Sequence, residues 1–232
     1  MLAAAVACGN LGDLGAVLAL EVAAPDSLEE YDTLRPRARA LNGHGDSVRA
    51  TILWSTLDTA VLSLVDSTTG KTIVRSVGAT PGRLLARTEG VSSNVISIQP
   101  LAAADTLFTA GPTALTPRRA DSLSDSLKVE LADTVAASGG GSPTVPLAGR
   151  PITYTIVYPA TAGPVTLVVR DTSHSLVAAA SVATGSSGIA FVKVRLLGPA
   201  VPDSVVVTAG ARRAVGTIVR GSPVTFTVRF VP

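Results

Sequence analysis

Histidine and cysteine, the side chains that most often act as general bases, nucleophiles or zinc ligands, are scarce in this sequence. The chain holds two histidines and one cysteine among 232 residues. His44 and His174 both fall in turn-like segments, so a histidine-rich zinc site is excluded and a Ser-His-Asp triad would need chance geometry. Cys8 stands alone, which excludes an intrachain disulfide and a multi-cysteine metal site. We expect both histidines to be exposed turn residues.

Two glycine-containing motifs match reactive loops only in part. Gly70-Lys71-Thr72 looks like the end of a phosphate-binding loop, but the position five residues before Gly70 is Val65 instead of glycine, and no helix is expected to follow. Gly185-Ser186-Ser187-Gly188 lacks the G-x-S-x-G spacing that exposes a nucleophilic serine. The sequence predicts a turn between two strands at the first motif and a hairpin turn at the second.

Carboxylates and the sole tryptophan also favour structural roles. The aspartates of the first half do not follow the D-x-D-x-D-G spacing of a calcium loop, so we expect them to cap turns; they are Asp26, Asp32, Asp46, Asp58 and Asp66. Trp54 alternates with Ile52 and is expected in the core, not at a ligand-stacking platform. The sequence therefore predicts no metal site, no cofactor and no catalytic residue, and a protein that is not an enzyme.

One arginine row is the candidate for contact with a partner. Arg35, Arg37 and Arg39 alternate with apolar residues, and three guanidinium groups on one strand face could bind lipid phosphates or an acidic protein. The alternative is a solvated strand edge whose charges prevent aggregation, and this alternative is favoured. The pairs Arg118-Arg119 and Arg212-Arg213 pose the same question, the second in an expected hairpin turn.

Composition favours strands over helices and argues against nucleic acid. Hydrophobic residues make up 47% of the chain, aromatic residues 3% and charged residues 16%, and the formal net charge is +2. Ala, Val, Leu, Thr and Ser dominate, a mixture typical of β-sheets. Basic residues are neither clustered nor interleaved with aromatic ones, so no nucleic-acid partner is expected. A length of 232 residues allows two ordinary domains.

The elements that must position these residues are short strands separated by turns. In residues 17–101, Leu34, Ala38 and Ala40 alternate with the arginines, and a second alternating strand runs from Val48 to Trp54 after the turn NGHGD. Pro36 removes a backbone donor, so the first of these strands is expected at a sheet edge or bulged there. Turn signals every 8–12 residues are typical of a β-sandwich.

The second half repeats this pattern after an interruption. Prolines and Gly111 break any period in residues 102–122, which we interpret as a linker. Residues 123–232 form the second expected sandwich. Its predicted strands alternate with period 2, and their inward residues are Ile152, Tyr154, Ile156 and Tyr158, then Val165, Leu167 and Val169, then Ala190, Val192, Val194 and Leu196, and last Val224, Phe226, Val228 and Phe230.

The N-terminal segment, residues 1–16, has two interpretations. A short apolar run ends in small residues directly before Cys8, as in the leader of a bacterial lipoprotein, whose cysteine is lipidated after cleavage. The run is shorter than a secretory apolar core and has no basic residue before it. Cys8 is therefore either a lipidation site or a small buried residue. No stretch approaches the roughly 20 apolar residues of a spanning helix, so membrane association is expected to be peripheral, through the N-terminus.

The turn order of the first half resembles the bacterial immunoglobulin-like group 2 domain. The counterparts of that family's turns and strand ends are Tyr31-Asp32-Thr33-Leu34, Asn42-Gly43-His44-Gly45, Trp54-Ser55-Thr56, Val65-Asp66-Ser67-Thr68-Thr69-Gly70, Pro81-Gly82 and Ala86-Arg87-Thr88-Glu89-Gly90. The order and spacing match over about 85 residues. Thr56 and Tyr31 depart from the commoner serine and glycine.

The second half is similar to the related group 1, or invasin-like, domain. The residues that carry this resemblance are Val145-Pro146-Leu147-Ala148-Gly149-Arg150-Pro151-Ile152-Thr153-Tyr154 and Ala183-Thr184-Gly185-Ser186-Ser187-Gly188-Ile189-Ala190. Gly185 replaces the family's usual acidic residue. Both resemblances imply two immunoglobulin-like antiparallel β-sandwiches in tandem, an extracytoplasmic location in the periplasm or at the cell surface, and a role in adhesion, spacing or assembly.

The sequence thus predicts a noncatalytic structural or binding protein that contacts a protein partner through sandwich edges and loops. One version is an adhesion-type module. The other is an extrinsic subunit that stabilises an integral membrane complex, with the apolar N-terminus as its anchor. The alternative is a carbohydrate-binding module, which would need exposed aromatic platforms, and the chain has only four Phe, three Tyr and one Trp.

Overall fold

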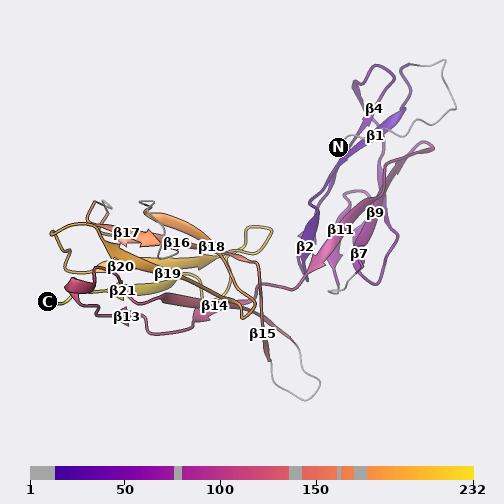
Figure 1. Ribbon diagram of the computed structural model, residues 1–232. Coiled ribbons are helices and arrows are strands. Elements are labelled where there is room, and N and C mark those ends of the chain that lie inside the picture. The colour runs from indigo at the N-terminus through magenta and orange to yellow at the C-terminus, as the bar shows by residue number, and fades with distance from the viewer. Residues whose placement is uncertain (1–13, 76–79, 136–142, 161–162, 170–176) are drawn as a thin grey trace. The chain divides into compact units, whose positions relative to one another are not determined.

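The computed structural model describes residues 14–75, 80–135, 143–160, 163–169 and 177–232. The chain divides into two compact units, residues 1–102 and 103–232. Within the described residues, every regular element is a β-strand except the 3-10 helix η1 (Arg119–Asp121) (Figure 1). Strand pairs are antiparallel apart from β11 with β2 and β13 with β21. The all-β fold class predicted from the sequence is confirmed.

The described residues of the first unit form three sheets. One has the order β1 (Ala19–Ala23), β4 (Arg37–Leu41) and β5 (Ser47–Val48). The second has the order β10 (Val91–Ser92), β9 (Gly82–Thr88), β11 (Ile96–Leu101) and β2 (Ser27–Glu29), and β6 (Leu53–Thr56) also pairs with β9. The third has the order β3 (Thr33–Leu34), β8 (Lys71–Val74) and β7 (Leu62–Asp66).

The core of the first unit is aliphatic, with one tryptophan. Its central buried cluster consists of Leu28, Leu34, Leu62, Val74, Leu84 and Ile98. Trp54 is 5% exposed, which confirms its predicted place in the core. A Cβ on Gly70 would lie 2.9 Å from Trp54 Cδ2 and 2.8 Å from Pro36 Cγ. Glycine at this turn therefore lets the indole and the proline ring pack directly against the backbone.

The expected strand through Pro36 changes sheets at that residue. Leu34 lies in β3 and pairs with β8, whereas Arg37 lies in β4 and pairs with β1. Arg35 and Pro36 belong to neither strand. The break follows from the proline, which has no N–H for a ladder and restricts the residue before it. The prediction of one strand from Leu34 to Ala40, bulged or at an edge, is corrected to two strands of different sheets.

The second unit is a sandwich of two five-stranded sheets. Sheet E has the order β12 (Thr106–Thr109), β14 (Leu127–Thr134), β19 (Ile189–Leu196) and β17 (Val165–Val168), and β15 (Thr144–Pro146) also pairs with β14. Sheet F has the order β13 (Ala114–Leu115), β21 (Val224–Val228), β20 (Val205–Ala211), β16 (Pro151–Tyr158) and β18 (Ala179–Ala183). Figure 1 shows these strands in the C-terminal part of the chain.

The segment expected to be a linker belongs to the second unit. Within residues 102–122, β12 pairs with β14 of sheet E, and β13 pairs with β21 of sheet F. Short strands can form here because Pro112 and Pro117 lie outside both of them, so no ladder donor is lost. Residues 103–122 therefore contain two edge strands of the sandwich, and the linker prediction is corrected.

The core of the second unit follows the predicted period-2 pattern on β16, β19 and β21 except at Tyr158, whereas β17 is buried at all four of its residues and Val169, expected inward, is only partly buried. The inward residues of β16, β19, β20 and β21 are buried, and Tyr154 and Phe226 are fully enclosed. Tyr158, expected inward, is 49% exposed because the register shifts between Ile156 and Tyr158. A bulge of this kind inserts one residue and moves the following side chain to the other face.

Candidate interaction surface

The arginine row is only partly preserved in the structure. Arg37 and Arg39 are exposed on β4, whereas Arg35 is exposed in the segment between β3 and β4. Arg39 faces Glu21 across the β1–β4 pair and forms an ion pair with it. The guanidinium group of Arg39 is thus already matched by a carboxylate of its own sheet. The row remains a predicted partner contact.

The histidine and glycine motifs occupy turns where they are described. His44 is exposed in the β4–β5 turn, and its backbone N–H donates to Asn42 Oδ1 at 2.9 Å. Gly70-Lys71-Thr72 leads from the β7–β8 turn into β8. Residues 185–188 form a tight turn in which Gly188 N–H donates to the Gly185 carbonyl at 2.9 Å. This turn joins β18 of sheet F to β19 of sheet E, so it connects the two sheets and is not a hairpin turn.

Two residues considered in the sequence analysis lie outside the described residues. Cys8, the lipidation candidate, and His174 both fall there. In the part of the chain that the structure describes, no helix is long and apolar enough to cross a membrane. In the same part, no group of three or more His, Cys, Asp or Glu side chains could hold a metal ion.

Two of the aspartates expected to cap turns, Asp58 and Asp66, accept hydrogen bonds from neighbouring side chains and backbone groups. The Asp58 carboxylate accepts hydrogen bonds from the guanidinium group and the backbone N–H of Arg83, at 2.8 to 2.9 Å. These bonds lower the pKa of Asp58. Asp66 caps the β7–β8 turn by accepting from the hydroxyls and backbone N–H groups of Thr68 and Thr69. Both arrangements leave the carboxylates occupied inside the fold.

The Asp66 cap gives a pH-dependent prediction. The Thr68 and Thr69 hydrogen bonds lower the pKa of Asp66 to about 2. A carboxyl whose folded pKa lies below its unfolded value of 3.8 stabilises the fold above pH 3.8 and loses this contribution as the pH falls through about 2. We expect the carboxyl 13C shift of Asp66 to titrate near pH 2. In the Thr68→Val/Thr69→Val variant it should titrate closer to pH 4; an unchanged midpoint would contradict the cap.

The outer face of sheet F carries small, uncharged side chains. Cross-strand partners share one face, and the register joins Ala114 to Thr227, Thr225 to Thr208, Thr208 to Thr155, and Thr153 to Ser181. We call the resulting surface the hydroxyl face; it consists of Ala114, Thr153, Thr155, Ala179, Ser181, Ala183, Val206, Thr208, Gly210, Thr225 and Thr227. None of these positions carries a charge.

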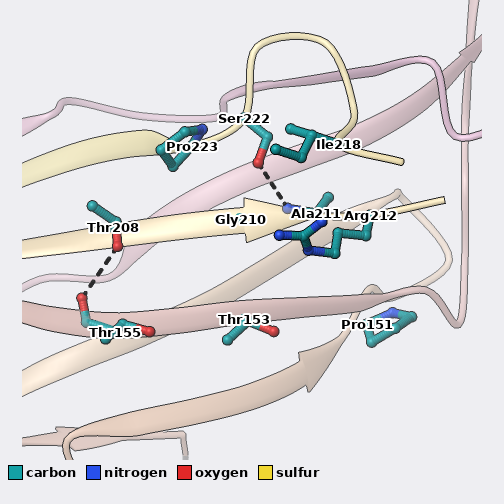
Figure 2. A pocket seen from close by; sticks show the side chains of 10 residues that line it. All are labelled: Pro151, Thr153, Thr155, Thr208, Gly210, Ala211, Arg212, Ile218, Ser222 and Pro223. Carbon is teal, nitrogen blue, oxygen red and sulfur yellow. Dashed lines mark hydrogen bonds between the residues drawn. The ribbon is translucent and has the colours of Figure 1, made fainter. Parts of the chain in front are cut away.

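A shallow groove of about 500 Å³ lies at one end of the hydroxyl face (Figure 2). Its floor is Gly210 with Thr153, Thr155 and Thr208, and its wall is the segment from Arg212 to Pro223. Ser222 Oγ accepts a hydrogen bond from Ala211 N–H at 3.0 Å, and Arg212 Nη1 donates to the Gly216 carbonyl at 2.8 Å. Arg212 is the one titratable residue in the lining. The groove can donate and accept hydrogen bonds, but it offers no activated nucleophile and no general base.

The outer face of sheet E differs sharply in charge. Lys128 lies opposite Phe191, and Glu130 lies opposite Ile189 on the β14–β19 pair. Lys193 and Arg195 alternate along β19 with the buried residues Val192 and Val194. This face therefore has the mixed charges expected of a solvated surface, whereas the hydroxyl face has none. Sequence reasoning missed this contrast, although the threonines that alternate with core residues in ITYTI and VTFTV were its signal.

Comparison with known proteins gives weak structural likenesses only. No protein-family model matches the chain, and no curated protein matches it. Domains 4 and 5 of the S-layer protein SbsC align with a TM-score of 0.33 at 12% identity, over 93% of this chain and 99% of that one. The D00-D0 domain of intimin aligns at 0.34 and 16%, over 92% and 100%.

A fibronectin(III)-like structure of Clostridium thermocellum CbhA aligns with a TM-score of 0.39 at 11% identity, over 90% of this chain and 94% of that one. At such scores these likenesses support no argument about function. The group 2 and invasin-like resemblances stay predictions. The assignment to paired antiparallel sheets rests on the strand pairing of this chain itself.

Proposed function

We propose that this protein is a noncatalytic, extracytoplasmic structural protein that binds a protein partner through the hydroxyl face of its second unit. The observation that carries the proposal is the absence of charge across five paired strands, on a protein whose opposite sheet face is charged. Interface cores are depleted of charged residues, because a buried charge must be paired or it costs free energy.

The side chains of the hydroxyl face suit an interface for a second reason. Threonine, serine, alanine and glycine lose little rotamer entropy when they are covered, far less than lysine or glutamate. Their hydroxyls can still donate and accept hydrogen bonds across an interface. A partner that covers this face would therefore gain contact area without desolvating an unpaired charge or ordering long side chains.

The finer proposal concerns the kind of partner. We infer an extrinsic subunit that buttresses an integral membrane complex, held near the membrane by the N-terminal segment. The support is the leader-like sequence before Cys8 together with the uncharged face. The carbohydrate-binding alternative gains nothing from the groove, since none of its ten lining residues is aromatic and sugar rings are usually stacked on aromatic platforms.

Site-specific photo-crosslinking in the native cell tests the proposal. A photoreactive amino acid at Thr153, exposed on the hydroxyl face, is expected to give a discrete adduct with another protein. The same amino acid at Lys128, exposed on the charged face, serves as the matched control and should give none. Thr208→Lys, which places a charge opposite Thr155 on the same face, two residues along β16 from Thr153, should abolish the adduct. Equal adducts from both positions, or none from Thr153, would refute the proposal.

A further inference from the structure

Among the described residues, β18 ends sheet F and no strand pairs with its outer edge. Two hydrogen bonds to the β16 side lie at the two ends of β18. Ile156 N–H donates to the Ala178 carbonyl, and Thr184 N–H donates to the Arg150 carbonyl, both at 2.9 Å. In an antiparallel pair, bonding positions alternate, so even-numbered residues of this segment bond to β16. The N–H and C=O groups of Ala179, Ser181 and Ala183 therefore point away from the sheet.

The other edges of the second unit are occupied or short in the described part of the chain. On β12, Leu107 N–H donates to the Arg220 carbonyl at 2.9 Å. On β17, Leu167 N–H donates to the Val177 carbonyl at 3.0 Å. β13 has two residues and lies between Pro112 and Pro117. Native proteins protect edges with such devices, or with lysine and inward charges. In β18 the sequence Ala-Ala-Ser-Val-Ala has no lysine, proline or charge, and no described segment pairs with its outer edge.

We propose that β18 pairs with β18 of a second copy of this chain, antiparallel and centred on Ser181. About a two-fold axis at Ser181, Ala179 lies opposite Ala183, and Ser181 lies opposite itself. All three are outward-bonding positions, so every free N–H and C=O along the edge gains a partner. Ala180 then lies opposite Val182 on the other face. No charged residue opposes its own copy anywhere along this register.

Pairing of β18 with its own copy is favoured over pairing with a different edge because it gives a closed assembly of two chains. A two-fold contact uses the same surface on both copies and ends at a dimer, whereas a contact between unlike edges of two copies leaves an edge open on each and builds rings or filaments. The dimer would join two copies of sheet F into one continuous sheet, with the hydroxyl faces side by side. Five residues per strand bury a small area, so the dimer is expected to depend on concentration. This inference needs only the β18 edge and does not depend on the proposed partner protein.

Cysteine trapping tests the register with pure protein. In a Cys8→Ser background the chain has no other cysteine, so Ser181→Cys introduces a single thiol. Hydrogen-bonded antiparallel partners have Cα atoms about 5.5 Å apart, within disulfide range. Thr153→Cys is the matched control: it lies opposite Ser181 on β16, so its two copies would be about 14 Å apart. Mild oxidation should give a covalent dimer from Ser181→Cys and none from Thr153→Cys.

A second variant separates association from folding. Ser181→Lys places a charge on the edge without removing a bond to β16, so the melting temperature should stay unchanged. Sedimentation should show that this variant is monomeric at concentrations where the parent chain dimerises. A parent chain that stays monomeric, or equal trapping at both cysteine positions, would overturn the self-pairing. If the chain does not dimerise but the photo-adduct at Thr153 forms, the dimer is refuted and the proposed function stands. If the chain dimerises but no photo-adduct forms, the proposed function is refuted and the dimer stands.

Discussion

Replacing Tyr154 by alanine is expected to lower the free energy of unfolding of the second unit by about 3–5 kcal/mol, the range for truncating a fully buried aromatic residue. Tyr154 is 0% exposed. Its hydroxyl donates to the Ala190 carbonyl at 2.8 Å and lies 3.3 Å from the Leu127 carbonyl. The side chain thus links β16 of sheet F to β14 and β19 of sheet E. Tyr154→Phe keeps the ring and should cost about 1 kcal/mol.

The sole tryptophan makes this prediction specific to one unit. Trp54 lies in the first unit, so its fluorescence follows the unfolding of that unit, whereas far-ultraviolet circular dichroism follows both. Tyr154→Ala should shift the dichroism transition and leave the tryptophan transition in place. A parallel shift of both signals would show that the two cores unfold as one.

Burial also raises the pKa of Tyr154 well above its ordinary value of 10. Because the folded pKa is raised, the stabilisation by the neutral phenol is complete below pH 10 and is lost as the pH rises above it. Ultraviolet titration should therefore show one of the three tyrosines ionising only when the second unit unfolds.

Gly82→Ala is expected to destabilise the first unit by about 1–3 kcal/mol, the usual cost of overpacking a core. An added Cβ would lie 2.3 Å from Leu62 Cγ and 2.6 Å from Leu62 Cδ1. Leu62 is 0% exposed and packed among core residues, so it has no free space to enter. At other strand positions, replacing glycine by alanine normally raises the free energy of unfolding slightly. A decrease at Gly82 would therefore point to the clash with Leu62.

A double-mutant cycle isolates the contact. Leu62→Val shortens the opposing side chain, so Gly82→Ala should cost less in that background than in the parent chain. Denaturation followed by Trp54 fluorescence measures both differences in the unit concerned. Equal costs in the two backgrounds would show that Leu62 is not the cause.

Local pattern predicted much of the fold, because period-2 alternation and turn chemistry act over a few residues. The strands around Tyr154, Val192 and Phe226 were found in this way. The turn at Glu89 and Gly90, both at positive φ, was expected from the group 2 resemblance. Pairing partners were not predictable, since they depend on residues far away in the chain. This is why residues 103–122 looked like a linker and why Leu34 and Arg37 were placed in one strand.

The candidate surface was out of reach of sequence reasoning for the same reason. Thr153, Thr208 and Thr225 come from three strands, and only the register of β16, β20 and β21 brings them onto one face. Reasoning from residue type pointed to arginines instead, because charge is visible at a single position. An uncharged face appears only when several strands are placed side by side. Gly82 was likewise read as a turn residue, although it begins β9 and makes room for Leu62.

Amide hydrogen exchange along β18 tests the central claim, an open and uncharged strand edge on the hydroxyl face. In dilute protein, the amides of Ala180, Val182 and Thr184 should be protected by their bonds to β16, while those of Ala179, Ser181 and Ala183 exchange rapidly. Raising the concentration should protect the second set. Uniform protection of all six amides in dilute monomer would mean that the edge is already covered, and would contradict the account.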